Sequence, residues 1–196
     1  MKSVRRLLAL AATLTLVACQ DAPVVNTPSS VTFAGKAPIR LNVAQINVVE
    51  SYRSTMQKPF VEHTAPTTPA AGVKLWASQR LAAAGTQGTV EVIIDDASIK
   101  ETPLTKKDGI EGFFTDDQDA RYDAHLRVTI RLYDGLSTVA QAESVVELNR
   151  MRTINEKASA AQRDAMFAAM VNDMMLQFDA EAESRLRQYF ARFIVG

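Results

Sequence analysis

Few side chains in this 196-residue chain are suited to covalent, metal or acid–base chemistry. There is one cysteine, Cys19, and there are two histidines, His63 and His125. A lone cysteine cannot form a disulfide within the chain or build a thiolate metal site, so it is left with the chemistry of a single nucleophile. The histidines could form a metal or acid–base pair. However, His63 lies in a proline-rich stretch and His125 on the polar side of an alternating segment, so packing and solvated roles are the simpler interpretation.

Two groups of carboxylates have a spacing that could support chemistry. Asp116, Asp117 and Asp119 could bind calcium, but their spacing and the lack of a turn glycine do not fit an EF-hand loop. The second group, which could serve a hydrolase, comprises Asp95, Asp96 and Glu101. No Gly-x-Ser-x-Gly, His-Glu-x-x-His or glycine-rich phosphate-binding motif accompanies them. The sequence therefore predicts a protein that is not an enzyme and that holds no metal or other cofactor.

The surroundings of Cys19 give the clearest chemical signal in the chain. Three basic residues among the first six precede the apolar residues 7–17. This apolar run is shorter than the roughly 20 residues that span a bilayer, and it has the length of an export signal. Residues 16–19 read LVAC, which resembles the lipobox of bacterial lipoproteins. The alternative is an ordinary secretory signal with an incidental cysteine.

In bacterial lipoproteins the cysteine sulfur takes a diacylglyceryl group, the chain is cut before the cysteine, and the new amine is acylated. The resemblance thus implies a signal peptide over residues 1–18 and lipidation of Cys19. Several acyl chains hold a protein firmly, since each buried methylene contributes about 0.8 kcal/mol. In enteric lipoproteins an Asp after the cysteine favours the inner membrane. Gln20 therefore implies the outer membrane, facing the periplasm, in preference to the inner membrane.

Composition and charge describe one folded domain behind a tether. Residues 19–37 are rich in Pro, Ser and Thr and are predicted to be a flexible tether, followed by a single periplasmic domain over 38–196. The hydrophobic fraction of 47% is ample for one core. The signal holds three of the 22 basic residues and none of the 22 acidic ones, so the mature chain is mildly acidic. Nucleic acid is not an expected partner, because binding it needs a concentrated basic face.

Apolar periodicity predicts the elements of this domain. Strands are expected near 39–48, where the apolar side changes midway, and at 90–94, 122–132 and 140–148. A helix is expected over 68–84, ended by Gly85, with Trp76 as a core anchor. A second helix is predicted over residues 159–195, starting with a Ser159–Gln162 capping box. At about 1.5 Å per residue it would be longer than the domain is wide, so a bend near Asp179 or a protruding end is expected.

The predicted order of elements is βαβββα. It predicts an α+β fold in which an antiparallel sheet has two helices packed on one face. Together with the tether, this layout resembles small envelope lipoproteins such as the auxiliary lipoproteins of lipid-handling ABC transport systems, and TolB-N-like domains. The runs VEHTAPTTPAAGVKLWASQRLAAAGTQGTVEVIIDDASI and RYDAHLRVTIRLYDG also resemble an uncharacterised bacterial lipoprotein family. The resemblance implies a membrane-anchored accessory subunit of an envelope complex, in lipid transport or envelope maintenance. The alternative is a stand-alone module that binds a lipid or small molecule between helices and sheet.

Two apolar clusters are candidate contacts for the expected envelope protein partner. The first lies in the polar, glycine-bearing segment KKDGIEGFFTDDQD and comprises Ile110, Phe113 and Phe114. Its alternative role is to fold back over the end of the core. The second lies near the end of the last predicted helix and comprises Tyr189, Phe190 and Phe193. A helix end with no sheet beneath it would expose these rings to a partner helix or to the membrane.

Overall fold

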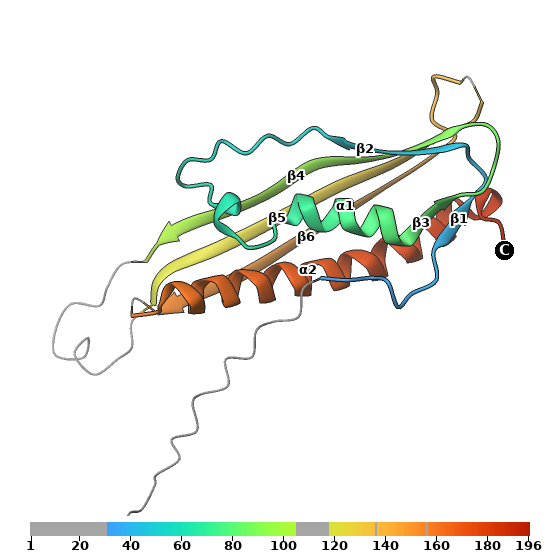
Figure 1. Ribbon diagram of the computed structural model, residues 1–196. Helices are drawn as coiled ribbons and strands as arrows, with labels where there is room; N and C mark the ends of the chain where they lie inside the picture. Colours follow the sequence, from blue (N-terminus) through green and yellow to red (C-terminus); the bar gives the residue numbers. More distant parts are fainter. Residues whose placement is uncertain (1–30, 105–117, 136, 156) are drawn as a thin grey trace, which may run out of the picture.

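The computed structural model describes residues 31–104, 118–135, 137–155 and 157–196. Its main sheet has four strands in the order β2 (Gln45–Glu50), β4 (Thr89–Pro103), β5 (Gln118–Tyr133) and β6 (Ala142–Asn155). Two helices pack on one face of this sheet, namely α1 (Pro69–Arg80) and α2 (Ala160–Tyr189) (Figure 1). The smaller elements are β1 (Ile39–Leu41), β3 (Leu81–Ala83) and the 3-10 helices η1 (Glu62–Thr64) and η3 (Ala191–Phe193).

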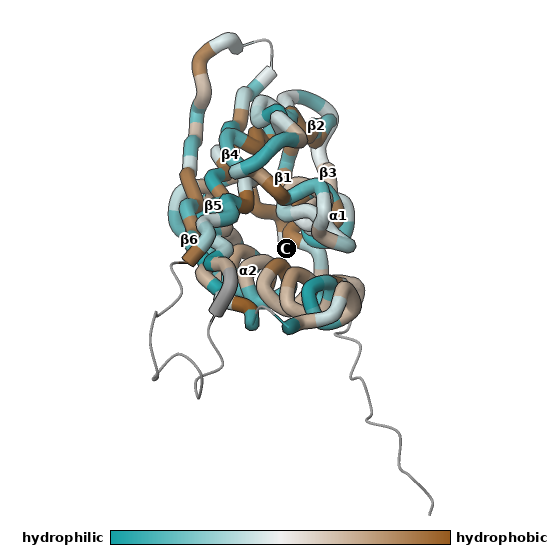
Figure 2. Tube along the Cα trace, turned by 90° about the vertical axis from the view of Figure 1, so that its left-hand side faces the viewer, coloured by the Kyte–Doolittle hydropathy of each residue, from teal (hydrophilic) through white to brown (hydrophobic). Residues whose placement is uncertain are grey.

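The α+β class, the element order and the placement of both helices on one face are confirmed. Figure 2, turned by 90°, shows α1 and α2 on the same side of the four strands. The sheet differs from the prediction in being mixed rather than wholly antiparallel. β2 runs parallel to β4, from Gln45 beside Thr89 to Glu50 beside Ile94. The cause is α1, because a helical crossover between two neighbouring strands brings the chain back to the end of the sheet from which it started.

The long hairpin of β5 and β6 follows its sequence pattern closely. Leu126, Val128 and Ile130 are fully buried against the helices, as their strict alternation predicts. On the other face Arg127 pairs with Glu147 and Arg131 with Glu143, each at 2.6 Å. These pairs are solvent-exposed, so each contributes only tenths of a kcal/mol. The register of the hairpin is therefore set mainly by which side chains must be buried.

The strand predicted near 39–48 is divided between two sheets. β1 pairs in parallel with β3, whereas β2 joins the main sheet. The change of apolar side in the sequence marks this division, at the buried Val43. The pairing of β3 with β1 also ends α1 at Arg80, before the predicted stop at Gly85.

The last helix is also shorter than predicted. α2 begins with the expected capping box of Ser159 and Gln162, continues without a break past Asp179 and ends at Tyr189. Beyond it the chain turns back along β1, where the Val195 amide donates to the Arg40 carbonyl at 2.9 Å. The residues after Tyr189 continue the apolar pattern of the predicted helix because they pack against the domain, and not because they extend the helix. None of the helices in the described ranges is both long and apolar enough to cross a membrane.

Gly85 provides a test of how closely β1, β2 and β3 are connected. A Cβ atom at this position would lie 2.5–2.7 Å from atoms of Asn42 and Val43, two of which belong to the backbone. We expect Gly85→Ala to lower the free energy of unfolding by about 1–3 kcal/mol, as overpacking does, measured by denaturant titration. Gly35→Ala is the control, since no atom lies within 4 Å of a Cβ placed there. Equal stability of the two variants would contradict this close approach.

Candidate functional site

The N-terminal segment closest to Cys19 is docked on the helices. Phe33 is 2% exposed, and its amide donates to Oε1 of Gln79 on α1 at 2.6 Å. Val31 is also buried, so residues 31–37 are part of the folded domain, although the sequence predicted a tether as far as residue 37. Cys19 itself lies outside the described residues. Only residues 20–30 separate it from Val31, so Cys19 lies within about 40 Å of the domain even for a fully extended chain.

This segment is held by an ionic network with a buried centre that we call the clasp, formed by Lys36, Trp76, Arg80, Asp179 and Glu183. Asp179, on α2, is completely buried. Its Oδ1 accepts hydrogen bonds from Trp76 Nε1 at 2.9 Å and Arg80 Nε at 2.7 Å, and its Oδ2 accepts from Lys36 Nζ at 2.5 Å. Arg80 also donates to Oε2 of Glu183 and to the carbonyl of Ala37. The clasp therefore joins α1, α2 and the segment that leads to Cys19.

The clasp keeps the Asp179 carboxyl group ionised. Burial by itself raises the pKa of Asp179, but the hydrogen bonds from Lys36, Arg80 and Trp76 outweigh it and lower the pKa below its usual value. A buried carboxylate with three donors is stable only while those donors are present. The sequence pattern predicted a helix bend near Asp179 or a protruding end, and it did not predict the clasp. A signal was present, because the pairs Trp76–Arg80 and Asp179–Glu183 each have the i, i+4 spacing of one helix face.

A second buried carboxylate fixes the connection between β2 and α1. Glu62, in η1, is 3% exposed and accepts from Tyr52 Oη at 2.6 Å and from the Ile99 amide at 3.2 Å. Burial by itself raises the pKa of Glu62, but the hydrogen bonds from Ser54 and Tyr52 outweigh burial, so the pKa lies below its usual value. Burial and the neighbouring Glu62 raise the pKa of Tyr52. These bonds hold the chain around η1 against β4.

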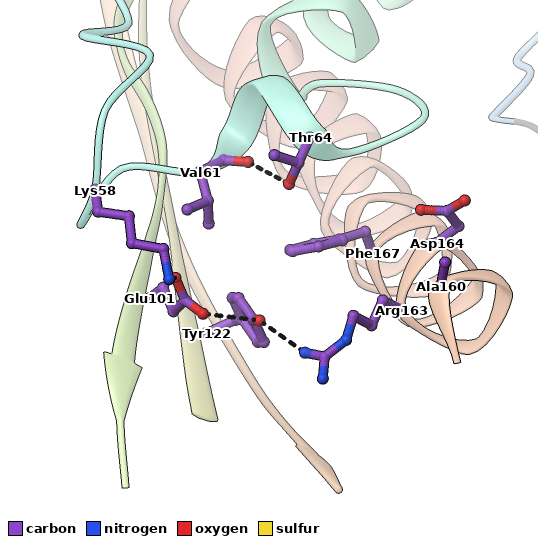
Figure 3. A pocket seen from close by; sticks show the side chains of 9 residues that line it. All are labelled: Lys58, Val61, Thr64, Glu101, Tyr122, Ala160, Arg163, Asp164 and Phe167. Carbon is purple, nitrogen blue, oxygen red and sulfur yellow. Dashed lines mark hydrogen bonds and ion pairs between the residues drawn. The ribbon is translucent and has the colours of Figure 1, made fainter. Parts of the chain in front are cut away.

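The η1 connection forms one wall of a hollow of about 320 Å³ at the end of the sheet where α2 begins (Figure 3). Val61 and Phe167 give it an apolar base. Its other lining residues are Lys58, Thr64, Glu101, Tyr122, Ala160, Arg163 and Asp164. The shape and lining suit a small ligand with both an apolar group and charged groups.

Polar contacts run across the sheet side of this hollow. Lys58 Nζ lies 2.8 Å from Oε2 of Glu101, and Tyr122 Oη donates to Oε1 of Glu101 at 3.2 Å. Arg163 donates to Tyr122 Oη at 3.4 Å. As Figure 3 shows, this row runs from the cationic Lys58 through the anionic Glu101 and the neutral Tyr122 to the cationic Arg163, and the anionic Asp164 also lines the hollow. The hollow therefore offers balanced charge rather than a site for a simple anion.

The open face of the sheet carries a third cluster, centred on His125. Its Nδ1 lies 3.2 Å from Asp96 Oδ2 and its Nε2 lies 3.1 Å from Glu147 Oε1. Burial lowers the pKa of His125, but the contacts with Glu147 and Asp96 outweigh it and raise the pKa. His125 was expected from the sequence to be a solvated strand residue, and it is ion-paired with Asp96 and Glu147 when it is protonated. His63 lies in η1, and the groups that contact both ring nitrogens of His125 are Asp96 and Glu147 rather than His63.

The carboxylates grouped by sequence are not gathered at one site. Asp95 accepts a hydrogen bond from Thr129 Oγ1 at 2.6 Å on the open face, near Asp96, whereas Glu101 lines the hollow. Across the described part of the chain, no group of three or more His, Cys, Asp or Glu side chains is arranged to hold a metal ion. Asp116, Asp117 and the side chain of Asp119 lie outside that part.

The predicted partner-binding residues fall into two groups. Ile110, Phe113 and Phe114 lie outside the described residues. At the other cluster, Tyr189 is 50% exposed, as expected. Phe190 was expected on the surface, but it is completely buried, and Phe193 packs partly against the core. The reason is the turn after α2, because the Asn42 amide donates to the Phe193 carbonyl at 2.7 Å and draws this end onto β1.

No family model and no curated protein matches this chain. Several solved structures resemble it weakly. A minor lipoprotein from Acinetobacter baumannii is 7% identical, with 80% of this chain and 98% of that chain covered and a TM-score of 0.42. An uncharacterized lipoprotein B from Nitrosomonas europaea is 12% identical, with 81% and 97% covered and a TM-score of 0.38. The rare lipoprotein B from Shewanella oneidensis is 16% identical, with 73% and 98% covered and a TM-score of 0.34. Likenesses this weak carry no functional argument.

The clasp makes a specific prediction about stability. Asp179→Asn keeps the shape of the side chain but leaves Arg80 facing an uncharged group, so we expect it to lower the free energy of unfolding by about 3–5 kcal/mol at neutral pH. The contribution of Asp179 is fully present above the unfolded pKa of about 3.9, and it is lost as the pH falls through the lower folded pKa. Denaturant titrations at neutral and acid pH should therefore show the two proteins converging in acid.

Asp173→Asn is the matched control for this experiment. Asp173 lies on the same helix, but it is exposed, and its ion pair is with the half-exposed Arg152, at 2.7 Å. Its replacement should cost less than about 1 kcal/mol. If Asp179→Asn were as mild as the control, the clasp would not hold the three segments together.

Proposed function

We propose that this chain is a lipoprotein of the bacterial envelope, held at the outer membrane through acyl chains on Cys19 and facing the periplasm. The observation that carries this proposal is the sequence LVAC at residues 16–19, placed after a basic segment and an apolar segment of export-signal length. Gln20 supports the outer membrane over the inner one. Because Cys19 is the single cysteine, its lipidation leaves the mature chain without a free thiol.

The proposed role of the domain is that of a non-enzymatic accessory subunit of an envelope complex, in lipid transport or envelope maintenance. The docked segment at residues 31–37 supports it, because it leaves only residues 20–30 between the domain and Cys19. The domain therefore stays within about 40 Å of its anchor, where membrane-bound partners are concentrated. The open face of the sheet, with its rows of paired charges around His125 and Glu147, is a surface of the kind that gives a protein contact its specificity.

A second candidate is a stand-alone module that binds a lipid or another small amphipathic molecule. The hollow beside α2 favours it, because its volume of about 320 Å³ and its apolar base at Val61 and Phe167 could receive a short apolar group. The row of Glu101, Tyr122 and Arg163 would then contact the polar part of the ligand.

The anchor is tested by replacing its cysteine. The unaltered chain should incorporate labelled palmitate and sediment with outer membranes, whereas Cys19→Ala should lose the label and accumulate as a heavier, uncleaved precursor. Ser3→Ala, a change within the signal that leaves residues 16–19 intact, is the control and should behave like the parent. A mature, unlabelled and freely soluble parent protein would rule out the proposed anchor and leave the ordinary secretory signal.

The hollow is tested by filling it. Ala160 is exposed and lines the hollow, whereas its neighbour Ala161 is exposed and does not. If the domain is a binding module, native mass spectrometry of protein from its own membranes should show a bound phospholipid, and Ala160→Trp should lose it while Ala161→Trp keeps it. Protein that carries no lipid, but recovers a stoichiometric envelope protein in mild detergent, would support the accessory role instead.

A further inference from the structure

The two edges of the main sheet are protected very differently. The edge strand β6 carries two arginines that reach α2, where Arg152 pairs with Asp173 at 2.7 Å and Arg150 donates to Gln177. Its remaining charged residues are Glu143 and Glu147. Charges of this kind prevent other chains from adding a strand to a sheet. The opposite edge, β2, reads QINVVE and has a single charged residue, Glu50, which pairs with Lys74 on α1 at 2.5 Å.

β2 is also exposed along its backbone and on both faces. Val48, on the helix side, is 38% exposed, and Val49, on the open side, is 39% exposed. The amides of Ala44 and Tyr52 donate to carbonyls of Gly88 and Ile94, which places the even-numbered backbone groups toward β4. By the alternation of a strand, the backbone groups of the three odd-numbered residues of β2 point away from β4. None of the described segments pairs with this edge.

We infer that this edge pairs with β2 of a second copy of this chain. The two strands run antiparallel about a two-fold axis at Asn47, so that two four-stranded sheets become one sheet of eight strands. On the helix side, Ile46 lies opposite Val48 of the partner subunit. On the open side, Asn47 lies opposite Asn47 of the partner subunit.

The sequence of β2 is self-complementary in this register, and it is less so when the axis moves toward Glu50. Apolar residues face apolar residues on the helix side, and Glu50 faces Ala44 of the partner subunit, so no like charges meet. A shift of two residues, with the axis at Val48, would place Glu50 opposite Ile46 of the partner subunit. A further shift, with the axis at Val49, would place Glu50 opposite Val48 of the partner subunit. With the axis at Val48, Val48 would still face an apolar side chain, Val48 of the partner subunit. Of these three registers, only the one centred on Asn47 keeps Glu50 away from the large apolar side chains of Ile46 and Val48 of the partner subunit.

The orientation of the pair agrees with a shared membrane anchor, a step that rests on the proposed function. A two-fold axis perpendicular to the sheet leaves the helices of both copies on one side. The segment at residues 31–37 lies on that side too, through the contacts of Phe33 with Gln79 and of Lys36 with Asp179. Both anchors can therefore enter the same bilayer. Confinement to one surface raises the effective concentration of the two copies, which favours a contact as short as six residues.

The test is a mixed disulfide between two differently tagged copies in their own membranes. One copy carries Ile46→Cys and the other Val48→Cys. In the proposed register these residues form a non-hydrogen-bonded pair with Cα atoms about 4.5 Å apart, which is within disulfide range. Mild oxidation should give the mixed dimer, while each variant alone should give little, because its own copies are then only diagonal neighbours. The parent chain, with Cys19 alone, should give none.

Two controls decide the outcome. Met151 lies on the other edge strand and is 53% exposed, so Met151→Cys paired with Val48→Cys should not cross-link. Val48→Lys, placed in the copy that carries Ile46→Cys, should abolish the mixed disulfide without lowering the melting temperature, because a charge at this edge opposes strand pairing. Met151→Lys in the same copy should leave the disulfide unchanged. Absence of the mixed dimer, or equal cross-linking through Met151, would overturn the pairing. Fractionation of the same samples reports the anchor separately, so cross-linked but unanchored protein would refute the proposed function and retain the pairing.

Discussion

The arrangement of the helical layer depends on the buried carboxylate of Asp179. A charge without solvent must be matched by hydrogen bonds, and its three donors come from two other parts of the chain. Trp76 and Arg80 fix α1 against α2, and Lys36 fixes the N-terminal segment across both. The same contact requires the helices to approach closely, and Gly72 permits it, since a Cβ there would lie 2.8 Å from Met175 Cγ.

Apart from Arg80 and Asp179 of the clasp, the buried residues of α1 and α2 are all apolar. Trp76 packs edge-on against Phe178 with ring centroids 4.9 Å apart, so the indole contributes both packing and a hydrogen bond. A polar group in such a core adds specificity when all of its bonds are made, because alternative packings would leave the charge unmatched. The clasp thus explains why one pairing of the alanine-bearing α1 with the methionine-rich face of α2 is preferred over sliding of the two helices.

Sequence reasoning was most reliable where one local pattern determines the result. The alternation in β5 and the capping box of α2 depend on neighbouring residues, and both are as predicted. It was less reliable where distant segments compete for the same residues. Leu81–Ala83 have the composition of a helix, but pairing with β1 makes them a strand. Phe190 fits a helical stripe, yet the turn after α2 buries it. The i, i+4 spacings marked one face of each helix, but joining those faces into the clasp required knowing how the two helices pack, which their spacing alone does not specify.

The docked N-terminal segment links the interior of the domain to its proposed place at the membrane. If the folded domain began at residue 38, as predicted, the domain could rotate freely about that point. Because Phe33 and Lys36 contact the helices, the chain that leads to the anchor leaves the domain at residue 31 instead, on the helix side. Under the proposed anchoring, the orientation that needs the least chain places the helices toward the bilayer. Turning the domain over would require residues 20–30 to pass around α2, whose diameter with side chains is about 10–12 Å. The open face and the free edge at β2 are then directed away from the anchor or along the membrane plane, where a partner can reach them.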